Sequence, residues 1–301
     1  MSRIHEALKK AAEERNAQAA SRTVSDLVDL QGTAAPAAVL TEQRPSAKVP
    51  VLQKVEPPVG SFQEFAKRCT SVTWKIAPSA SVFSAHMEHL AGAEKFRTLR
   101  SRLYQIASAQ PLKKILITSS TPAEGKTFVA ANLAQSFIRQ TDKRVLLIDS
   151  DLRASRLHLH LGAHEKPGLT DYLRGECDEF QVTQIGADEN LCLIPGGADV
   201  TNPSELLHSD RMKQLLDRLS LVFDWIILDS PPALAVHDAS ILADMCDGVL
   251  LVVRAGVTDS EVAARASAEF PEKKLLGVVL NRVEKSDTYG DYYYGYEPDK
   301  S

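Results

Sequence analysis

The sequence predicts an α/β fold, in which an open, mostly parallel β-sheet is flanked by helices. Six short apolar runs recur along the chain, at residues 114–118, 144–149, 191–195, 225–229, 248–253 and 275–281. Helical candidates lie between these runs and start near Lys126, Ser204, Asp238 and Ser260. Apolar strands that alternate with helices are typical of a parallel sheet covered on both faces. In such a sheet, ligands bind at the carboxyl ends of the strands.

The composition fits a globular protein and limits which partners and which cellular compartment we expect. The 301 residues are 44% hydrophobic and carry a formal net charge of −4, which gives no general case for nucleic acid or an anionic membrane as a partner. The four cysteines form no CxxC pair, so we expect neither a disulfide framework nor a zinc site, and a reducing cytoplasm fits. The start, MSRIHEALKK, lacks the apolar core of a signal peptide, and no apolar run reaches the ~20 residues that cross a bilayer.

The chain divides into four predicted parts. Residues 1–15 fit a short amphipathic helix, either solvated or docked on a partner. Residues 16–85 are rich in Ala, Pro and Ser without a sustained period, which indicates a flexible linker; FQEFAKRC and VTWKI are candidate ordered islands within it. Residues 86–283 form the α/β domain, which opens with helical spacing over 87–106. Residues 284–301 are predicted to be a disordered tail.

The segment after the first predicted strand, TSSTPAEGKTFVAANLAQ, carries the pattern of a phosphate-binding loop (P-loop). Gly125, Lys126 and Thr127 follow a strand and open a helix, as such a loop requires. Backbone N–H groups there can bind phosphate oxygens, Lys126 can reach the β- and γ-phosphates, and the Thr127 hydroxyl can bind Mg²⁺. The usual pattern has glycine where this chain has Ser120, and a chance GKT is the alternative. The predicted nucleotide contacts are Ser120, Thr121, Pro122, Ala123, Glu124, Gly125, Lys126, Thr127 and Phe128.

Carboxylates end two of the predicted strands. In LLIDSDLR, Asp149 and Asp151 lie at the carboxyl end of the predicted strand and Arg153 follows them. In IILDSPP, Asp229 lies at the carboxyl end of another strand. A carboxylate at the tip of an apolar strand is costly to bury unless it is paired or faces a metal. Beside a phosphate loop, Asp151 and Asp229 most simply bind Mg²⁺ together with Thr127, directly or through water. For any single aspartate, helix capping is the alternative.

Two further features follow from position. Asn281 and Arg282 end the last predicted strand, at the edge where a nucleotide would bind. The Asn281 amide suits a purine edge, and a turn-forming asparagine is an equal alternative.

In RLHLHLGAH, His158, His160 and His164 have metal-like spacing, but no further His or Cys cluster completes a site. We therefore favour a surface or interface segment for them.

The last 14 residues, TYGDYYYGYEPDKS, concentrate tyrosines where no core can form. Tyrosine normally packs into a core or an interface. Here five of the chain's seven tyrosines stand among Gly, Asp, Glu and Lys: Tyr289, Tyr292, Tyr293, Tyr294 and Tyr296. Because the last strand is predicted parallel to the others, this tail leaves the sheet at the edge of the phosphate loop. Its position predicts that these tyrosines are substrates.

Taken together, these motifs resemble the bacterial tyrosine kinases (BY-kinases), cytoplasmic P-loop kinases of capsule and exopolysaccharide systems. The resemblance covers roughly residues 86–301: SSTPAEGKT is similar to the family's Walker A, LLIDSDLR to its Walker A′ and IILDSPP to its Walker B, and the tail is tyrosine-rich. Glu94, Arg97 and Arg100 match its ExxRxxR motif, which implies one charged contact surface in a ring of subunits; a solvated helix face is the alternative. Partition and septum-placement ATPases share the Walker A/A′/B layout, but they usually carry a signature lysine where this chain has Thr121.

The resemblance implies a non-specific protein-tyrosine kinase that uses ATP and Mg²⁺ to autophosphorylate the tail and regulates exopolysaccharide or capsule chain length or export. Lys126 would stabilise the phosphates. Asp149 would accept the tyrosine proton, with Asp151 as the alternative, and Arg153 would hold the transferred group or the acidic cluster. An ATPase switch that controls assembly or positioning is the alternative function.

The resemblance also implies partners and a location. A membrane-embedded polysaccharide co-polymerase, or chain-length determinant, would activate the kinase, and a cognate tyrosine phosphatase would reverse it. Further copies of the chain would form the ring. The protein would be cytoplasmic and peripheral at the inner membrane through its activator.

Overall fold

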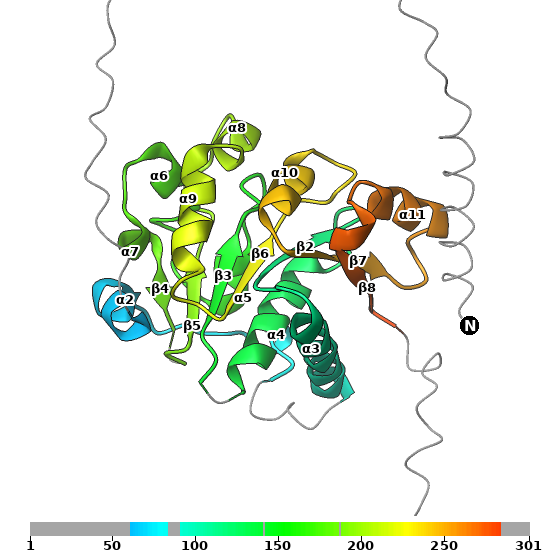
Figure 1. The fold of residues 1–301 in the computed structure, drawn as a ribbon, viewed down its shortest axis with the longest axis horizontal. Coiled ribbons are helices and arrows are strands. Elements are labelled where there is room, and N and C mark those ends of the chain that lie inside the picture. The colour runs from blue at the N-terminus through cyan, green and yellow to red at the C-terminus, as the bar shows by residue number, and fades with distance from the viewer. Residues whose placement is uncertain (1–60, 84–90, 141, 187, 284–301) are drawn as a thin grey trace, which may run out of the picture. The chain divides into compact units, whose positions relative to one another are not determined.

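The structure is a computed structural model that describes residues 61–83, 91–140, 142–186 and 188–283. Its strands are β1 (Thr70–Ser71), β2 (Lys114–Ser119), β3 (Val145–Asp149), β4 (Gln184–Ile185), β5 (Leu191–Ile194), β6 (Trp225–Asp229), β7 (Gly248–Arg254) and β8 (Leu275–Asn281). They form one sheet in the order β1-β4-β5-β3-β6-β2-β7-β8 (Figure 1). Neighbouring strands are parallel except β4 and β5. The predicted open, mostly parallel α/β sheet is confirmed, and every predicted apolar run contains a strand.

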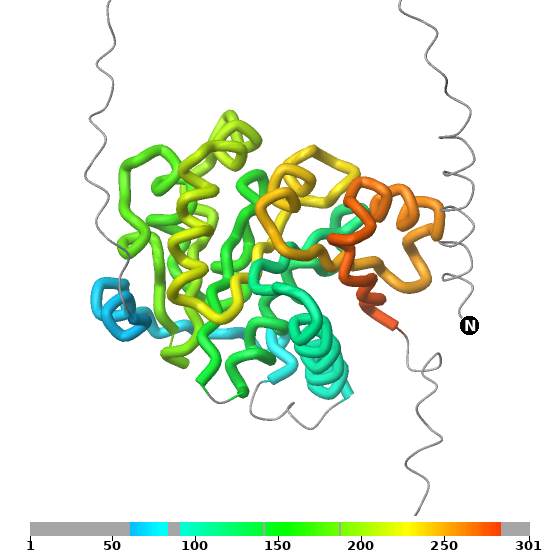
Figure 2. The backbone as a smooth tube through the Cα atoms, viewed as in Figure 1, coloured from blue at the N-terminus to red at the C-terminus, as the bar shows by residue number. Residues whose placement is uncertain are grey.

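Helices cover both faces of this sheet (Figure 2). They are α2 (Phe62–Arg68), α3 (Ala91–Ala109), α4 (Lys126–Ile138), α5 (Leu157–Leu161), α6 (Leu169–Arg174), α7 (Glu179–Val182), α8 (Pro203–Leu207), α9 (Asp210–Leu219), α10 (Asp238–Met245) and α11 (Ser260–Ala268), with short 3-10 turns η1 (Pro78–Ala80) and η2 (Glu272–Lys274). Alternate side chains of β3 enter different layers of the core. Leu146 and Ile148 belong to the core layer that includes α2 and α6 to α11, whereas Val145 and Leu147 belong to the layer that includes α3, α4 and α5.

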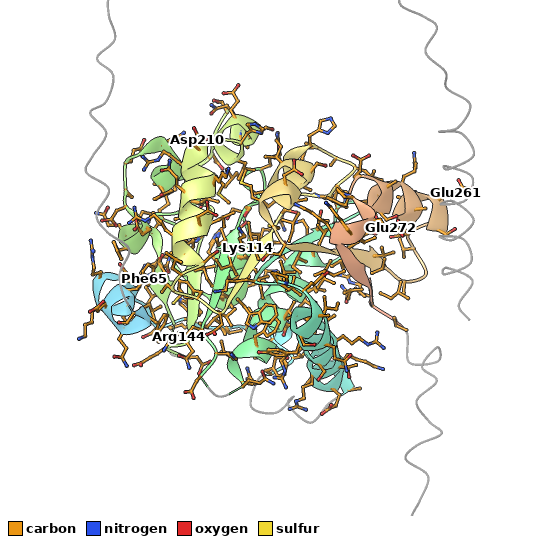
Figure 3. The ribbon with its side chains drawn as sticks, in the orientation of Figure 1. Phe65, Lys114, Arg144, Asp210, Glu261 and Glu272 are labelled. Carbon is orange, nitrogen blue, oxygen red and sulfur yellow. The ribbon has the colours of Figure 1, made fainter. Side chains whose placement is uncertain are left out.

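Residues 61–83 correct the predicted linker over 16–85, because they fold onto the α/β domain. Phe65 of α2 (labelled in Figure 3) is 1% exposed. Its ring packs against Phe180 and Phe223 with centroid separations of 5.2 and 5.5 Å. The average composition of the segment concealed these aromatic contacts. Burial of an aromatic side chain outweighs the weak helical propensity of so short a helix.

The chain that follows α2 is bound to the domain by strand pairing and by hydrogen bonds to α4. It adds β1 to the sheet beside β4 and then makes the η1 turn. The Ser81 hydroxyl donates to the Gln135 side chain at 2.6 Å, and the Val82 N–H donates to Asn132 Oδ1 at 2.8 Å, so α4 holds this segment. The ordered domain therefore begins well before residue 86.

Other predicted segments are only partly within the described residues. The predicted helix over 87–106 corresponds to α3 (Ala91–Ala109), and its residues 87–90 lie outside the described residues. The predicted N-terminal helix (1–15), the linker residues before 61 and the predicted tyrosine tail (284–301) lie outside the described residues. In the part of the chain that the structure describes, no helix has both the length and the apolar character needed to cross a membrane.

Candidate active site

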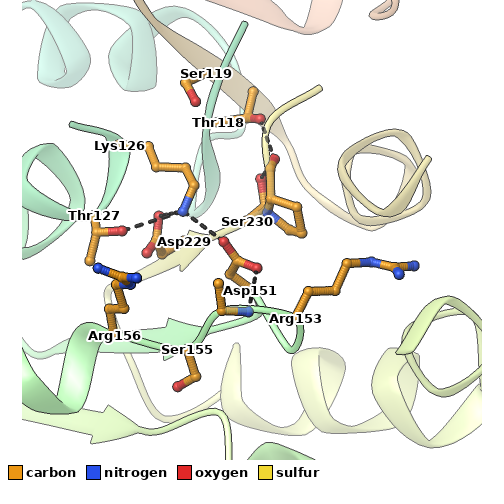
Figure 4. Close-up of polar contacts among 12 residues, drawn as sticks. Thr118, Ser119, Lys126, Thr127, Asp151, Arg153, Ser155, Arg156, Asp229 and Ser230 are labelled. Atoms are coloured by element: carbon orange, nitrogen blue, oxygen red, sulfur yellow. Dashed lines mark hydrogen bonds and ion pairs between the residues drawn. The ribbon is translucent and has the colours of Figure 1, made fainter. Parts of the chain in front are cut away.

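The predicted phosphate loop and the acidic strand ends form one site. In the sheet, β6 lies between β3 and β2, and Asp149 at the end of β3 is in register with Asp229 at the end of β6. Helix α4 begins at Lys126, directly after the loop that follows β2. Lys126 Nζ consequently lies 2.8 Å from Asp151 Oδ2 and 3.8 Å from Asp229 Oδ1 (Figure 4).

The loop between β2 and α4 is held by Glu124, whose side chain points back into the protein and is 2% exposed. Its Oε2 accepts from the Thr121 N–H at 2.7 Å, and its Oε1 accepts from the Thr258 hydroxyl in the loop after β7. Gly125 has a φ of +97°, and a Cβ there would lie 2.1 Å from Asn281 Nδ2. Only glycine satisfies both constraints, which explains its place before the lysine.

Asn281 closes the loop from the other side. Its Nδ2 donates to the Glu124 carbonyl at 2.8 Å, and its Oδ1 accepts from the Arg282 N–H at 3.0 Å. The side chain therefore braces the loop that begins α4, a role that neither sequence interpretation of Asn281 included.

Asp149 lies beneath the site, not open to it. Its Oδ2 accepts from the Ser155 hydroxyl at 2.7 Å and from the N–H groups of Arg156 and Leu157, each at 2.9 Å, and Oδ1 accepts from the Asp151 N–H at 3.2 Å. The side chain is fully buried, and this burial raises the pKa of Asp149 although the hydrogen bonds oppose the rise. The role of Asp149 as proton acceptor stays a prediction, and the alternative, Asp151, lines the cavity of the site.

Asp229 is a buried carboxylate with little compensating charge. Among the described residues, its Oδ1 has no hydrogen-bond partner. Burial raises the pKa of Asp229 to about 7, against the attraction of Lys126. Burial also disfavours the charged form of Lys126, but Asp229 and Asp151 together outweigh it and raise the lysine pKa. One lysine thus faces two carboxylates, Asp151 and Asp229, beside the Thr127 hydroxyl, and oxygen donors with excess negative charge fit Mg²⁺.

We expect Asp229 to make the free protein less stable as pH rises from about 4 to about 7. Its folded pKa of about 7 lies above the ordinary value of ~3.9, so in this window the folded state holds a proton that the unfolded state releases. The contribution is complete below about pH 4 and is lost as pH rises through about 7. Urea unfolding across this pH range should show that the free energy of unfolding declines by an amount on the order of a few kcal/mol, set by the pKa difference, and the decline should be smaller in Asp229→Asn. An equal decline in that variant would assign the effect to other groups.

Arg153 is paired within the domain. Its Nε and Nη2 donate to the two carboxylate oxygens of Asp238 at 2.8 and 3.2 Å, and Nη2 also donates to the Ser204 hydroxyl at 2.9 Å. Asp238 is fully buried at the start of α10, and its hydrogen bond raises the pKa of Arg153. The guanidinium joins the loop after β3 to α8 and α10, and Arg153 also lines the cavity. Its role in holding the transferred group or the acidic cluster stays a prediction.

A cavity of about 890 Å³ opens over the loop, a volume typical of small-molecule sites. Of the predicted nucleotide contacts, its lining contains Pro122, Ala123, Gly125, Lys126, Thr127, Phe128, Asn281 and Arg282. Ser120 and Glu124 are instead buried beneath it, and the Thr121 N–H is bonded to Glu124. Arg156 and His160 also line it, although sequence patterns assigned neither of them to the site. The i, i+4 spacing of these two residues was the available signal.

The three histidines have different surroundings. His158 is buried, His160 lines the cavity and His164 is exposed, so of the predicted surface or interface segment only His164 is a plain surface residue. Burial, reinforced by the nearby charges of Arg156 and Lys126, lowers the pKa of His160. Among the described residues, no group of three or more His, Cys, Asp or Glu side chains is arranged to hold a metal by itself. A cation here would need further ligands, as Mg²⁺ does when it binds with phosphate oxygens and water.

The three charged residues of the predicted contact surface on α3 do not share one environment. Glu94 and Arg97 form an ion pair one turn apart on the exposed side of the helix. Arg100 instead donates to the Ser136 carbonyl of α4, and burial lowers the pKa of Arg100. The expected single charged surface is corrected, because Arg100 braces two helices of its own chain.

The sheet, the phosphate loop and the strand-end carboxylates define a P-loop fold of the Walker A/A′/B type, which implies nucleotide binding. A family model described as an AAA domain matches residues 112–261. The tyrosine-protein kinase YwqD of Bacillus subtilis is 38% identical over 207 residues, which are 67% of this chain and 86% of that protein. The tyrosine-protein kinase wzc of Salmonella typhimurium is 38% identical over 208 residues, 68% of this chain but 29% of that protein.

A solved structure agrees with these relatives. The kinase domain of the Escherichia coli tyrosine kinase ETK superposes with a TM-score of 0.60 at 36% identity, over 67% of this chain and 80% of that one. The chain belongs to the bacterial tyrosine kinases and is a protein-tyrosine kinase.

Proposed function

We propose that this kinase phosphorylates the tyrosine cluster at its own C-terminus and thereby regulates the chain length or export of an exopolysaccharide or capsule. The end of β8 gives the main support. Asn281 and Arg282 line the cavity, so the chain that leads to the tail departs from its rim. At ~3.3–3.6 Å per extended residue, Tyr289 and Tyr296 lie at most roughly 25 and 50 Å from Arg282. This reach serves the same subunit or a neighbouring one.

In the proposed reaction, the tyrosine oxygen bonds to the γ-phosphorus of ATP while the bond from that phosphorus to the β,γ-bridging oxygen breaks, which yields phosphotyrosine and ADP. Lys126 neutralises phosphate charge. Asp151 accepts the phenolic proton, because a tyrosine hydroxyl with a pKa of about 10 needs an acceptor during attack. With Asp151 as the proton acceptor, Thr127 and Asp229 would hold Mg²⁺, which supplies further charge neutralisation when bound.

The proposed regulation involves partners. A membrane co-polymerase activates the kinase and places it at the cytoplasmic side of the membrane, and a tyrosine phosphatase resets the tail. Glu94 and Arg97 contribute to a ring of subunits in which one tail enters a neighbour's site. Each phosphate adds about −1.5 to −2 charges, so repulsion within the acidic tail couples phosphorylation to disassembly.

The test is incubation of the purified chain with radiolabelled ATP, followed by mapping of the phosphorylated residues. We expect label on the tail tyrosines, and we expect a variant with all five of them changed to phenylalanine to lose it. The matched control, Tyr104→Phe in α3, should keep the label. Equal labelling of the five-site variant would rule out the tail as the substrate. Phosphate release without labelled protein, even with the cytoplasmic segment of a candidate co-polymerase added, would favour the ATPase switch.

A further inference from the structure

Four cationic side chains line the cavity, and two of them are paired with carboxylates of the same chain. Lys126 and Arg153 are bonded to buried aspartates. Among the described residues, the side chains of Arg156 and Arg282 have neither a hydrogen bond nor an ion pair, although both border the cavity. An arginine in this state is available for an anion, and its planar fork suits two oxygens of one phosphate or carboxylate.

The sheet order separates these two arginines. Arg282 follows β8, two strands from β2 on one side, whereas Arg156 lies in the loop after β3, two strands from β2 on the other. Asp151 and Asp229 follow strands on the Arg156 side of β2. Figure 4 shows Arg156 extending toward Thr127 in the same part of the site. Arg156 therefore stands at the phosphoryl end of the cavity.

The backbone of Arg156 is fixed from below. The buried carboxylate of Asp149 accepts the N–H groups of Arg156 and Leu157 and the hydroxyl of Ser155 within 2.7–2.9 Å. Arg156 directly precedes α5, and His160, one turn further along the same helix face, also borders the cavity. The guanidinium itself remains exposed. A backbone held in this way directs the side chain at its target without a rearrangement on binding.

We propose that Arg156 is a catalytic residue that binds the phosphoryl group during its transfer, and that Asp149 positions it. Charge spreads over the three equatorial oxygens of this group as the bond to the bridging oxygen breaks and the bond to the tyrosine oxygen forms. Arg156 would donate two N–H bonds to these oxygens and gives up no proton, because the phenolic proton passes to Asp151. The proposal rests on the kinase activity and does not depend on which tyrosine is the acceptor.

The test uses the full-length chain and the variants Arg156→Gln and Arg156→Lys, with Arg174→Gln as the matched control. Arg174 is an exposed arginine at the end of α6 and does not line the cavity. The readouts are the initial rate of total phosphotyrosine formation at saturating Mg²⁺ and ATP, and the dissociation constants of ADP and of a non-hydrolysable ATP analogue. Unchanged ADP binding reports that the variant is folded.

We expect Arg156→Gln to slow phosphotyrosine formation by about 100-fold or more, as loss of a donor to developing charge does, and Arg156→Lys to recover part of the rate. The affinity for the ATP analogue should fall at least about fivefold while ADP affinity changes less than about twofold, because only the analogue carries a γ-phosphate. The control should match the parent. Parental rates and affinities in Arg156→Gln would overturn the proposal.

A second anion, an acidic side chain beside the acceptor tyrosine, has the same chemistry, and the binding readout separates the two. If Arg156 bound this carboxylate, Arg156→Gln would leave both nucleotide affinities unchanged. Its rate loss would also vanish in a chain whose tail acids, Glu284, Asp287, Asp291, Glu297 and Asp299, are changed to their amides. That pattern would also overturn the proposal. Label on residues outside the tail would contradict the proposed substrate without affecting the nucleotide result.

Discussion

A chain with Lys126 replaced by methionine should form phosphotyrosine at least about 100 to 1,000 times more slowly than the parent. Methionine keeps much of the length and apolar stem of lysine but removes the charge that faces the phosphates. In the free protein this charge lies 2.8 Å from one aspartate and 3.8 Å from another, so the substitution also leaves those carboxylates facing each other. The pKa of Asp229 should therefore rise further, which moves the stability loss with pH to higher values.

The measurement is the initial rate of total phosphotyrosine formation at saturating Mg²⁺ and ATP. Lys213→Met is the matched control, because Lys213 is an exposed lysine of α9 outside the cavity and its loss should leave the rate unchanged. A Lys126→Met rate within about tenfold of the parent would show that the lysine contributes little to transfer. Circular dichroism of both variants separates lost chemistry from lost folding.

Replacing Phe65 with alanine should lower the free energy of unfolding by about 3–5 kcal/mol. Phe65 is 1% exposed and touches two other aromatic rings, Phe180 on α7 and Phe223 before β6. The truncation removes that contact and leaves a cavity that the surrounding β-sheet cannot close. Because α2 has only seven residues, loss of its central anchor should also release the helix.

Urea unfolding of the two proteins tests this directly. Gln63→Ala, on the exposed side of the same helix, is the control and should change stability by no more than about 0.5 kcal/mol. If Phe65→Ala cost less than about 1 kcal/mol, α2 would not be part of the folded unit in solution. Protection of α2 amides from hydrogen exchange in the parent gives an independent check.

The fold could be predicted from sequence because its signals are local. Each apolar run is long enough to mark a strand, and the step from strand to GKT to helix lies within a dozen residues. The linker prediction over 61–83 was wrong for the opposite reason, although the candidate ordered island FQEFAKRC contains α2. Composition averages over many residues, whereas the order of this segment depends on contacts such as those of Phe65 with side chains more than 100 residues away.

The site residues could be placed at the correct edge of the sheet, but their individual partners could not. Asp149 and Asp151 are two residues apart and look equivalent in sequence. Asp149 is enclosed by groups six to eight residues further along, whereas Asp151 faces Lys126. Similarly, no sequence signal near Arg153 predicts its pairing with Asp238, which is 85 residues away. Proton transfer and charge pairing depend on these distant contacts.

The brace around the phosphate loop has an entropic consequence. Glu124 accepts hydrogen bonds from the Thr121 N–H within the loop and from the Thr258 hydroxyl after β7, and Asn281 donates to the loop backbone. Fixing the backbone of one residue costs about 1–2 kcal/mol at 25 °C, and here folding has already met that cost. Nucleotide association should therefore be limited by encounter and desolvation, and its calorimetric signature should contain little of the unfavourable entropy of a loop that becomes ordered on binding.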